Sequence, residues 1–336
     1  MNIESQKSLK PYTTFAVDVN AKYFVQVNNI SELQDLISDP LWQEEKHYII
    51  GKGSNILFTK DFDGIIVYNN LEGIDIINED EEKAMVGVAA GEDWHRFVMW
   101  TVDRGLWGIE NLALIPGTVG AAPVQNIGAY GVEAKDTIVS VDVIDLVSGE
   151  VSTLRNDECD FGYRTSIFKQ RPHYFVTKVT FQLSKQPHPR LEYGSMKDQL
   201  TQKGIEQPTL GQVAETVIAI RKSKLPDVGE ISMAGSFFKN PITTSQHAQE
   251  ILARYPDMPH FDLPDGQVKV PAGWLLETLG YKGIIDGKVG TYNKHALVLV
   301  NHGGATGAEV WEFAQKMMRH VHDTFGLDLE PEVIIM

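Results

Sequence analysis

The sequence of 336 residues contains a single cysteine, Cys159, so it can form neither an intramolecular disulfide bond nor a multi-cysteine metal cluster. No apolar run approaches the roughly 18 residues that a membrane-spanning helix needs, and the N-terminus lacks the apolar core of a signal peptide. Basic residues are scarce, because 30 Lys and Arg against 45 Asp and Glu give a formal net charge of -15. That charge disfavours general attraction to nucleic acid or to an anionic membrane. We expect a cytoplasmic protein of a reducing compartment, with no nucleic-acid partner and no membrane insertion.

Familiar nucleotide-binding motifs are missing as well. The stretch GKGSNI has Ile56 where a Rossmann motif has its third glycine, and it enters a strand instead of a helix. A P-loop is excluded because Lys282 stands at its first glycine position and Val289 at its Ser/Thr position. The sequence also has no G-x-S-x-G elbow and no H-E-x-x-H zinc pair. We therefore predict no metal site, and we expect any nucleotide to be held by a different kind of loop.

The residue pattern predicts an ordered chain of alternating strands and helices, with glycine concentrated in the loops between strands. Apolar residues make up 43% of the sequence, which is typical of a globular protein. In the first two-thirds we predict strands at 21–28, 48–50, 56–58, 65–68, 84–90 and 174–183, a hairpin at 138–154, and helices at 31–37, 91–105 and 210–221. Ser31 and Gln34 have the spacing of a capping box for the first helix, and residues 186–208 read as a loop. After a domain boundary near Pro226, we predict helices at 245–254, 272–279 and 307–324 and strands at 295–300 and 329–335.

Two glycine-rich loops stand out: the first glycine loop, GKGSN (51–55), and the second, IPGTVGAAPVQNIGAYG (115–131). Backbone N–H groups of such loops can form a nest around a phosphate without a helix. Either loop taken alone is also compatible with an ordinary tight turn. Because both occur in a chain that lacks the other nucleotide motifs, we favour phosphate binding at two converging strand connections.

Several polar residues are candidates for chemistry. Arg164, in FGYRTSIFK, could present a fixed guanidinium to a carboxylate, whereas Arg221 could simply end a helix favourably. Ser236, in AGSFFKNP, is either a turn residue or a hydroxyl held on a loop by aromatic packing. Glu330 and Glu332 would share one face of a terminal strand, where charges also discourage edge pairing. Cys159 reads as a small buried apolar residue.

Nine sequence stretches, taken in their order along the chain, resemble the UDP-N-acetylenolpyruvoylglucosamine reductase family over nearly its whole length. The matching stretches are YTTF (12–15), GKGSNIL (51–57), the segment 105–131, FGYRTSIFK (161–169), RKSKLPD (221–227), AGSFFKNP (234–241), AGWLLE (272–277), HALVLVN (295–301) and LEPEV (329–333). The resemblance implies an α+β fold with an FAD-binding region of the vanillyl-alcohol-oxidase type at 1–222, in subdomains of about 1–70 and 71–222. It further implies an α/β substrate-binding domain at 223–325 and a C-terminal strand at 326–336 that returns to the active site.

The resemblance also implies roles for individual residues. The catalytic set would be Arg164, Ser236 and Glu332. The substrate-binding set would be Tyr163, Tyr193, Lys224 and Asn240, with Tyr193 on the tyrosine loop of the longer family class. The FAD-binding set would be Gly51, Lys52, Gly53, Ser54, Asn55, Ile115, Pro116, Gly117, Thr118, Gly120, Ala121, Gln125, Asn126, Ile127, Gly128, Gly131 and Arg221. Two positions depart from the family pattern: Lys52 replaces the more usual Gly or Glu, and Ile334 stands where relatives often have Arg.

The activity implied is the reduction of an enolpyruvyl nucleotide sugar by NADPH through noncovalent FAD, in a monomeric enzyme of peptidoglycan precursor synthesis. Arg164 and Glu332 would stabilise negative charge that develops on the substrate, and Ser236 would supply the proton. Two other classes stay open at this point. A related FAD oxidase would consume oxygen without NADPH, and a silent flavin-binding or nucleotide-sugar-binding module would show no turnover with NADPH.

Overall fold

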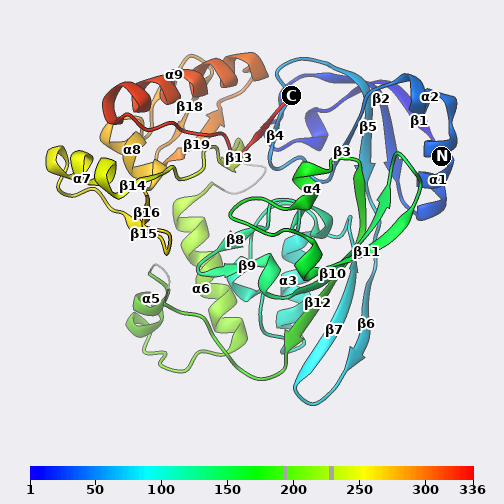
Figure 1. Ribbon diagram of the computed structural model, residues 1–336, viewed down its shortest axis with the longest axis horizontal. Coiled ribbons are helices and arrows are strands. Elements are labelled where there is room, and N and C mark those ends of the chain that lie inside the picture. Colours follow the sequence, from blue (N-terminus) through cyan, green and yellow to red (C-terminus); the bar gives the residue numbers. More distant parts are fainter. Residues whose placement is uncertain (193–194, 227–230) are drawn as a thin grey trace. The chain divides into compact units, whose positions relative to one another are not determined.

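The computed structural model describes residues 1–192, 195–226 and 231–336, and it divides into two compact units that we treat separately (Figure 1). Unit 1 comprises Met1–Lys7, Ala21–Lys52 and Asp63–Ser223, and unit 2 comprises Ser8–Asn20, Gly53–Phe62 and Lys224–Met336. Two early segments of the chain therefore belong to the same unit as its C-terminal third. The functional domains expected at 1–222, 223–325 and 326–336 stay a prediction.

A four-stranded sheet forms one part of unit 1. Its order is β1 (Ile3–Ser8), β2 (Asn20–Val27), β5 (Phe62–Asn69) and β3 (His47–Ile50), and β3 runs parallel to β5. Helices α1 (Ile30–Ser38) and α2 (Pro40–Glu44) follow β2, and Leu33 and Leu36 of α1 are fully buried in the core of this part. The predicted cap at Ser31 is wrong. The helix begins earlier, and the Asn29 side chain accepts the hydrogen bond from the Glu32 amide, because an Asn in extended backbone is itself a strong N-cap.

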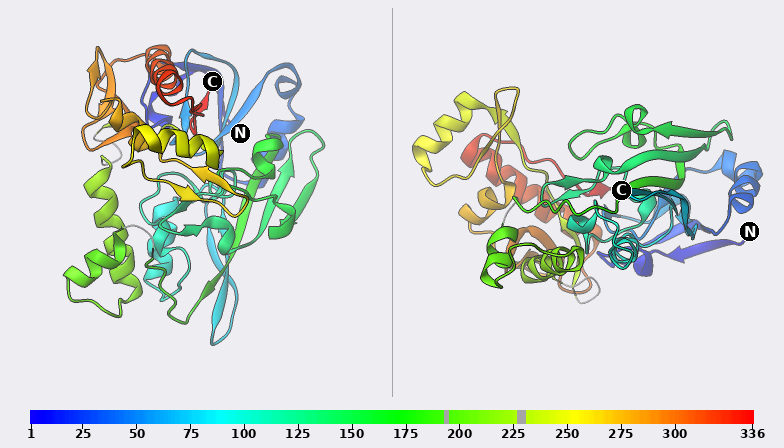
Figure 2. Two further views of the ribbon diagram at one scale, coloured as in Figure 1. Left: turned by 60° about the vertical axis from the view of Figure 1, so that its left-hand side comes forward. Right: turned by 90° about the horizontal axis from the view of Figure 1, so that it is seen from below.

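A five-stranded antiparallel sheet forms the other part of unit 1. Its order is β11 (Val151–Arg155), β10 (Ile138–Asp145), β12 (Tyr174–Ser184), β7 (Lys83–Ala89) and β6 (Ile74–Glu79). Strands β6 and β7 project as a long two-stranded arm (Figures 1 and 2). The predicted strands and hairpin are confirmed here, but β6 was not predicted, because five of its six residues are exposed and show no alternation.

Helix α3 (Trp94–Val102) packs against this sheet. Its predicted apolar face is confirmed, since Trp94, Phe97, Val98 and Thr101 are all buried, and the Phe97 and Phe181 rings lie 5.0 Å apart. The helix ends at Val102 instead of Gly105. The other helices of unit 1 are α4 (Ile167–Gln170), α5 (Met196–Gln202) and α6 (Leu210–Lys224). Helix α6 was predicted, whereas α5 lies in a segment that we expected to be a loop, because only Met196 and Leu200 of that short helix are buried.

Unit 2 is built around the sheet β13 (Ser232–Ser236), β19 (His295–Asn301), β18 (Val289–Tyr292) and β17 (Ile285–Asp286). Helices α8 (Ala272–Thr278) and α9 (Gly307–Phe325) pack against it (Figure 2). Helix α7 (Ser245–Arg254) accompanies a small sheet of β14 (Ile242–Thr244), β16 (Gln267–Lys269) and β15 (Phe261–Asp262). The predictions of α7, α8, α9 and β19 are confirmed, including the buried face of α9 that carries Val310, Ala314, Met317, Val321 and Phe325.

The terminal strand is much shorter than predicted. Only β20 (Ile334–Ile335) forms, parallel to β4 (Ile56–Leu57), and Pro331 makes an isolated bridge with Phe238. Proline has no amide hydrogen to donate, which interrupts a strand ladder at that residue. Glu330 and Glu332 therefore do not lie on one regular strand, and the prediction that they share a strand face is wrong.

The early segments of unit 2 are joined to its C-terminal part by specific contacts. The Phe15 and Phe237 rings lie 6.1 Å apart in an edge arrangement, and Asn301 Nδ2 donates to the Phe15 carbonyl at 3.1 Å. The Thr14 amide donates to the Gly53 carbonyl at 3.2 Å, and the Thr14 carbonyl accepts from the Met233 amide at 3.0 Å. The YTTF stretch thus links the first glycine loop to strand β13.

Gly307→Ala is expected to destabilise unit 2. A Cβ atom at this first residue of α9 would overlap the backbone carbonyl of Phe58, which cannot move without disturbing its neighbours. Overpacking of this kind costs roughly 1–3 kcal/mol, to be read from the urea midpoint at constant slope. Gly211→Ala in α6 is the control, since no atom lies within 4 Å of its added Cβ. Equal midpoints for the two variants would contradict the packing argument.

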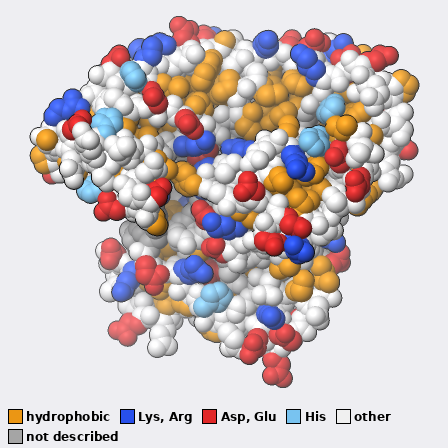
Figure 3. Space-filling model, viewed as in Figure 1, with side chains coloured by type: hydrophobic (Ala, Val, Ile, Leu, Met, Phe, Trp, Pro, Cys, Tyr) orange, Lys and Arg blue, Asp and Glu red, His pale blue; other side chains and the backbone are white. Residues whose placement is uncertain are grey.

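The surface view gives the distribution of charge. Acidic and basic side chains are interspersed over the face of the molecule in Figure 3. Among the described residues, no helix is both long and apolar enough to cross a membrane.

Candidate functional site

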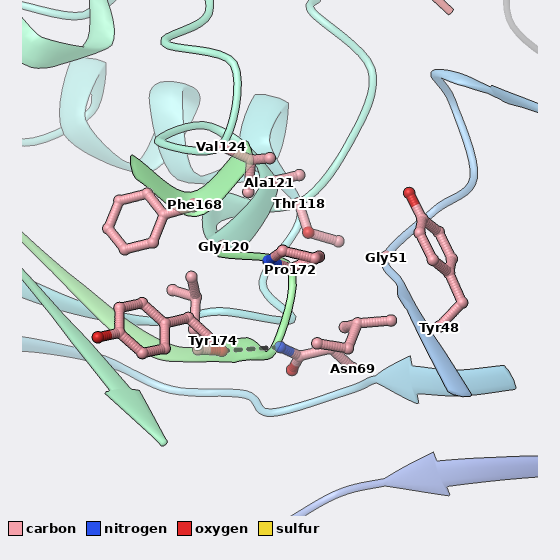
Figure 4. Close-up of a pocket in the computed structure, with 12 residues that line it drawn as sticks. Tyr48, Gly51, Asn69, Thr118, Gly120, Ala121, Val124, Phe168, Pro172 and Tyr174 are labelled. Carbon is pink, nitrogen blue, oxygen red and sulfur yellow. Dashed lines mark hydrogen bonds between the residues drawn. The ribbon is translucent and has the colours of Figure 1, made fainter. Parts of the chain in front are cut away.

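A hollow in unit 1 lies where its two sheets and the second glycine loop meet (Figure 4). Its lining residues come from β3 and the loop after it, the end of β5, the second glycine loop, and the α4–β12 segment. They are Tyr48, Ile49, Gly51, Asn69, Thr118, Gly120, Ala121, Val124, Phe168, Pro172, Tyr174 and Val176. Asn69 Nδ2 donates to the Val176 carbonyl at 2.9 Å and so fixes one wall. Burial raises the pKa of Tyr48 to about 12, which keeps its hydroxyl protonated.

Two glycines shape this hollow by the close approach that they permit. A Cβ at Gly51 would lie 2.6 Å from Thr118 Oγ1, and a Cβ at Gly120 would lie 2.5 Å from the Ala90 Cβ. Only glycine fits such positions without displacing a neighbour. The first and second glycine loops thus come together at Gly51 and Thr118, as expected for a shared phosphate-binding nest.

Asn126 holds the second glycine loop in shape from within. It is fully buried and has a left-handed φ of +44°. Its Nδ2 donates to Glu133 Oε2 at 3.0 Å and to the Gly162 carbonyl at 3.1 Å, while its Oδ1 accepts from the Lys135 amide at 3.0 Å. The side chain therefore connects the loop to the turn that carries Arg164.

Arg164 occupies a tight turn between Gly162 and Thr165, with an unusual left-handed φ of +55°. Its Nη2 donates to the Gly128 carbonyl at 2.9 Å, and its guanidinium carbon lies 5.5 Å from the Tyr163 ring centre. Lys169 Nζ donates to the Arg164 carbonyl at 3.0 Å and secures the turn. Residues with strained backbone that several contacts hold in place occur frequently at functional sites. Here the strained turn places the Arg164 guanidinium beside the second glycine loop.

Arg221, near the end of α6, offers a second cation in unit 1. Its Nε atom is buried and has no hydrogen-bond partner within the described part of the chain. A buried polar atom without a partner costs free energy unless a ligand or water satisfies it. The orphaned N–H is therefore suited to an acceptor atom of a bound ligand.

Ser236 lies in unit 2, at the end of β13. Its side chain is exposed, and it follows Gly235, whose φ of +71° marks an irregularity in the pairing of β13 with β19. The two phenylalanines after it are buried, and the Phe237 amide donates to the Leu297 carbonyl at 2.8 Å. The expectation of a hydroxyl presented beside anchoring aromatic residues therefore agrees with this geometry, at a strand end instead of a loop.

The backbone of unit 2 brings Glu332 to the same place. The Glu332 amide donates to the Phe237 carbonyl at 2.8 Å, and Asn55 Nδ2 donates to the Glu332 carbonyl at 3.1 Å. The Ile334 amide then donates to the Asn55 carbonyl at 3.0 Å. Ser236, Glu332 and the end of the first glycine loop are therefore held together by backbone pairing, although they are far apart in sequence.

The predicted substrate-binding residues are dispersed over both units. Tyr163 is exposed in unit 1 beside Arg164, and Lys224 is exposed in unit 2. Asn240 Oδ1 accepts a hydrogen bond from the Ala272 amide at 3.0 Å, at the start of α8. Tyr193 lies outside the described residues. The roles assigned to these residues, to the catalytic set and to the FAD-binding set stay predictions.

Sequence analysis missed several residues of the hollow, above all Tyr48, Asn69, Phe168 and Tyr174. Their position along the chain could have indicated them. Tyr48 lies in the strand that runs into the first glycine loop, and Asn69 lies at the end of a neighbouring strand. Asp93, which caps α3 and pairs with Lys52, was not among the predicted site residues.

The residues present suit FAD, whose diphosphate and ring system are the groups that glycine loops and an orphaned arginine N–H can meet. The glycine loops approach each other at Gly51 and Thr118. The buried Arg221 Nε atom has no hydrogen-bond acceptor among the described residues, and the Arg164 guanidinium donates to the Gly128 carbonyl. In comparisons with known families, residues 21–155 match the FAD binding domain. Residues 227–336 match the UDP-N-acetylenolpyruvoylglucosamine reductase, C-terminal domain.

Curated relatives match over full length. The chain is 44% identical to the UDP-N-acetylenolpyruvoylglucosamine reductase of Flavobacterium johnsoniae, with 100% of both chains covered. It is also 44% identical to the reductase of that name from Chromobacterium violaceum, covering 100% of this chain and 99% of the relative. The crystal structure of the reductase from Thermus caldophilus superposes with a TM-score of 0.70 at 24% identity, over 100% of this chain and 99% of that one. The expected fold class, an α+β FAD-binding region followed by a separate C-terminal domain, is confirmed.

Proposed function

The chain belongs to the UDP-N-acetylenolpyruvoylglucosamine reductase family of oxidoreductases, and from this membership we propose that it reduces UDP-N-acetylglucosamine enolpyruvate to UDP-N-acetylmuramate with NADPH. The observation that carries the proposal is the convergence of Ser236, Glu332 and Asn55 in unit 2 through the Glu332–Phe237 and Asn55–Glu332 hydrogen bonds. A flavin-binding protein without this reaction has no need for a serine hydroxyl and a glutamate joined to the first glycine loop.

FAD would be held by the backbone of the two glycine loops and by the Arg221 N–H, and once reduced by NADPH it would supply a hydride to the terminal carbon of the enolpyruvyl group. Negative charge then develops on the adjacent carbon and spreads into the substrate carboxylate. Arg164 offers a permanent cation with several N–H donors, and Nη2 already donates to the Gly128 carbonyl. The planar guanidinium is suited to bind a carboxylate bidentately and to stabilise that charge.

Proton delivery completes the reaction. We propose that Ser236 donates a proton to the carbon next to the carboxylate, because it is exposed while Phe237 and Phe238, which follow it, are buried and anchor the chain there. A proton-bearing Glu332 would donate a hydrogen bond to the developing oxyanion. The substrate carries a diphosphate and a carboxylate, and Tyr163, Tyr193, Lys224 and Asn240 are proposed to bind it.

The full proposal includes noncovalent FAD, NADPH as cosubstrate, and a monomeric enzyme that works in the cytoplasm. A reducing compartment suits the buried thiol of Cys159, whose pKa burial raises to about 12, so that it stays protonated and unreactive.

The proposal is tested by the visible spectrum of the purified protein under anaerobic conditions. NADPH should bleach the flavin band, and subsequent addition of the enolpyruvyl substrate should restore it. A flavin that NADPH does not bleach, or that only oxygen reoxidises, would contradict the proposed activity, and the second result would favour an oxidase.

We expect acid precipitation to release the flavin from the protein. The described residues that line the hollow include neither cysteine nor histidine, the residues that most often bond covalently to flavin, and Cys159 lies in the core of unit 1. The measurement is the flavin absorbance of the supernatant after precipitation, at about one FAD per chain. Colour retained in the pellet would show a covalent link.

A further inference from the structure

Lys52 and Asp93 form an ion pair in unit 1, between Lys52 Nζ and Asp93 Oδ2. The Lys52 side chain is 43% exposed and that of Asp93 is 19% exposed. The other carboxylate oxygen of Asp93, Oδ1, accepts from the Arg96 amide at 2.7 Å and caps α3. Burial opposes ionisation of Asp93, yet these two partners hold the pKa of its carboxyl below the usual range. Asp93 is thus a fixed anion.

The residues around Asp93 are also bonded to the second glycine loop. The Trp94 amide donates to the Gly117 carbonyl at 3.2 Å, the Val119 amide donates to the Glu92 carbonyl at 2.8 Å, and Asp93 itself bridges with Thr118. The start of α3 is therefore part of the framework of that loop.

His95, the second residue of α3, adds a further bond, because its Nδ1 accepts from the Leu114 amide at 3.1 Å. Burial lowers the pKa of His95, so the imidazole stays neutral and able to accept.

From this geometry we propose that the Lys52–Asp93 ion pair is a clasp that positions the two glycine loops relative to each other for FAD, with Lys52 as a positioning residue instead of a direct ligand of the diphosphate. The inference rests on the proposed function. Thr118 lies on the bridge to Asp93 and also against Gly51, so the pair and the Gly51–Thr118 contact form two links between the same loops. An ammonium neutralised by a carboxylate adds little net charge at the nest, which relies on backbone N–H groups.

The test is FAD affinity of the apoprotein, measured by quenching of flavin fluorescence, for Lys52→Met, Asp93→Asn, the double variant and Lys52→Arg. Asparagine is as good an N-cap as aspartate, so Asp93→Asn removes the pair while leaving the helix capped. We expect each single variant to weaken FAD binding roughly 3–5-fold, the upper part of the range for a partly exposed ion pair. The double variant should be no weaker than either single variant, and Lys52→Arg should bind FAD nearly as the wild type does.

A matched control is Lys178→Met. Lys178 pairs with Asp142 at 2.9 Å in the same unit with similar exposures of 45% and 22%, but on strands β12 and β10 instead of the glycine loops. FAD affinity should not change in this variant. A comparable loss there would mean that any surface ion pair of unit 1 has this effect, and the clasp would be disproved.

The alternative role of Lys52 gives the opposite pattern. If the ammonium binds the diphosphate directly, Asp93→Asn frees it and leaves FAD affinity unchanged or higher, while Lys52→Met weakens binding whatever residue stands at 93. That pattern would overturn the clasp. So would an FAD affinity equal to that of the wild type in both single variants, Lys52→Met and Asp93→Asn. A wild-type protein that does not bind FAD would instead refute the proposed function.

Discussion

Replacing Ser236 by alanine is expected to slow reduction of the enolpyruvyl substrate by on the order of 10²–10⁴, the usual contribution of a positioned general acid. Reduction of the flavin by NADPH should continue at nearly the wild-type rate, because hydride transfer to the flavin needs no proton from this hydroxyl. Stopped-flow absorbance at the flavin band times the two half-reactions separately. Ser236→Cys, which keeps a transferable proton, should lie between wild type and alanine.

The control for this experiment is Ser232→Ala, at the opposite end of β13. This substitution also removes a serine hydroxyl from β13, and it should leave the rates of both half-reactions unchanged. If Ser236 is only a turn residue, Ser236→Ala would lower stability by about 1 kcal/mol and would spare both steps. Slowing of both half-reactions to the same extent would also exclude the role of proton donor.

Arg164→Lys is expected to be far from conservative and to lower turnover with substrate by roughly 10²-fold or more, as loss of an oriented donor to a developing oxyanion does. Lysine keeps the charge but not the planar fork of N–H groups. It cannot donate to the Gly128 carbonyl and offer paired donors to a carboxylate at once, as the guanidinium of Arg164 can. The measurement is the rate of flavin reoxidation by substrate, together with thermal unfolding to show that the fold is retained.

Arg155→Lys serves as its control, because Arg155 belongs to the same unit and its ion pairs with Asp157 and Glu158 are exposed. This variant should keep wild-type kinetics. Near-normal turnover in Arg164→Lys would remove Arg164 from the catalytic set, whatever its place beside the second glycine loop.

The spacing of apolar residues predicted helices and strands well where the buried residues lie on one face of the element. Helix α9 is an example, because its buried residues recur at helical spacing from Val310 to Phe325. The edge strand β6 has almost no buried face, so its pattern carries no such signal. The segment 329–335 illustrates the opposite error, since its apolar residues suggested a strand that Pro331 interrupts.

The candidate site was predictable in its residue types but not in its internal contacts. Motif resemblance identified Arg164, yet its left-handed backbone and its bond to Gly128 depend on a turn that only the folded chain shows. The pairing of Lys52 with Asp93 joins segments that are distant in sequence, and no local pattern encodes such a contact. The same holds for the bond between Asn55 and Glu332.

The interleaved course of unit 2 bears on how proteins of this kind can exchange parts during evolution. A crossover near residue 223 between two diverged relatives would take Phe237, Asn301 and β20 from one parent. Their partners Phe15 and β4 would come from the other parent. Such a chimaera would inherit mismatched halves of one core, so the early segments and the C-terminal third must change together. Inheritance of unit 2 is therefore constrained by pairs of residues at opposite ends of the gene, although the boundary near residue 223 looks like a natural place to recombine.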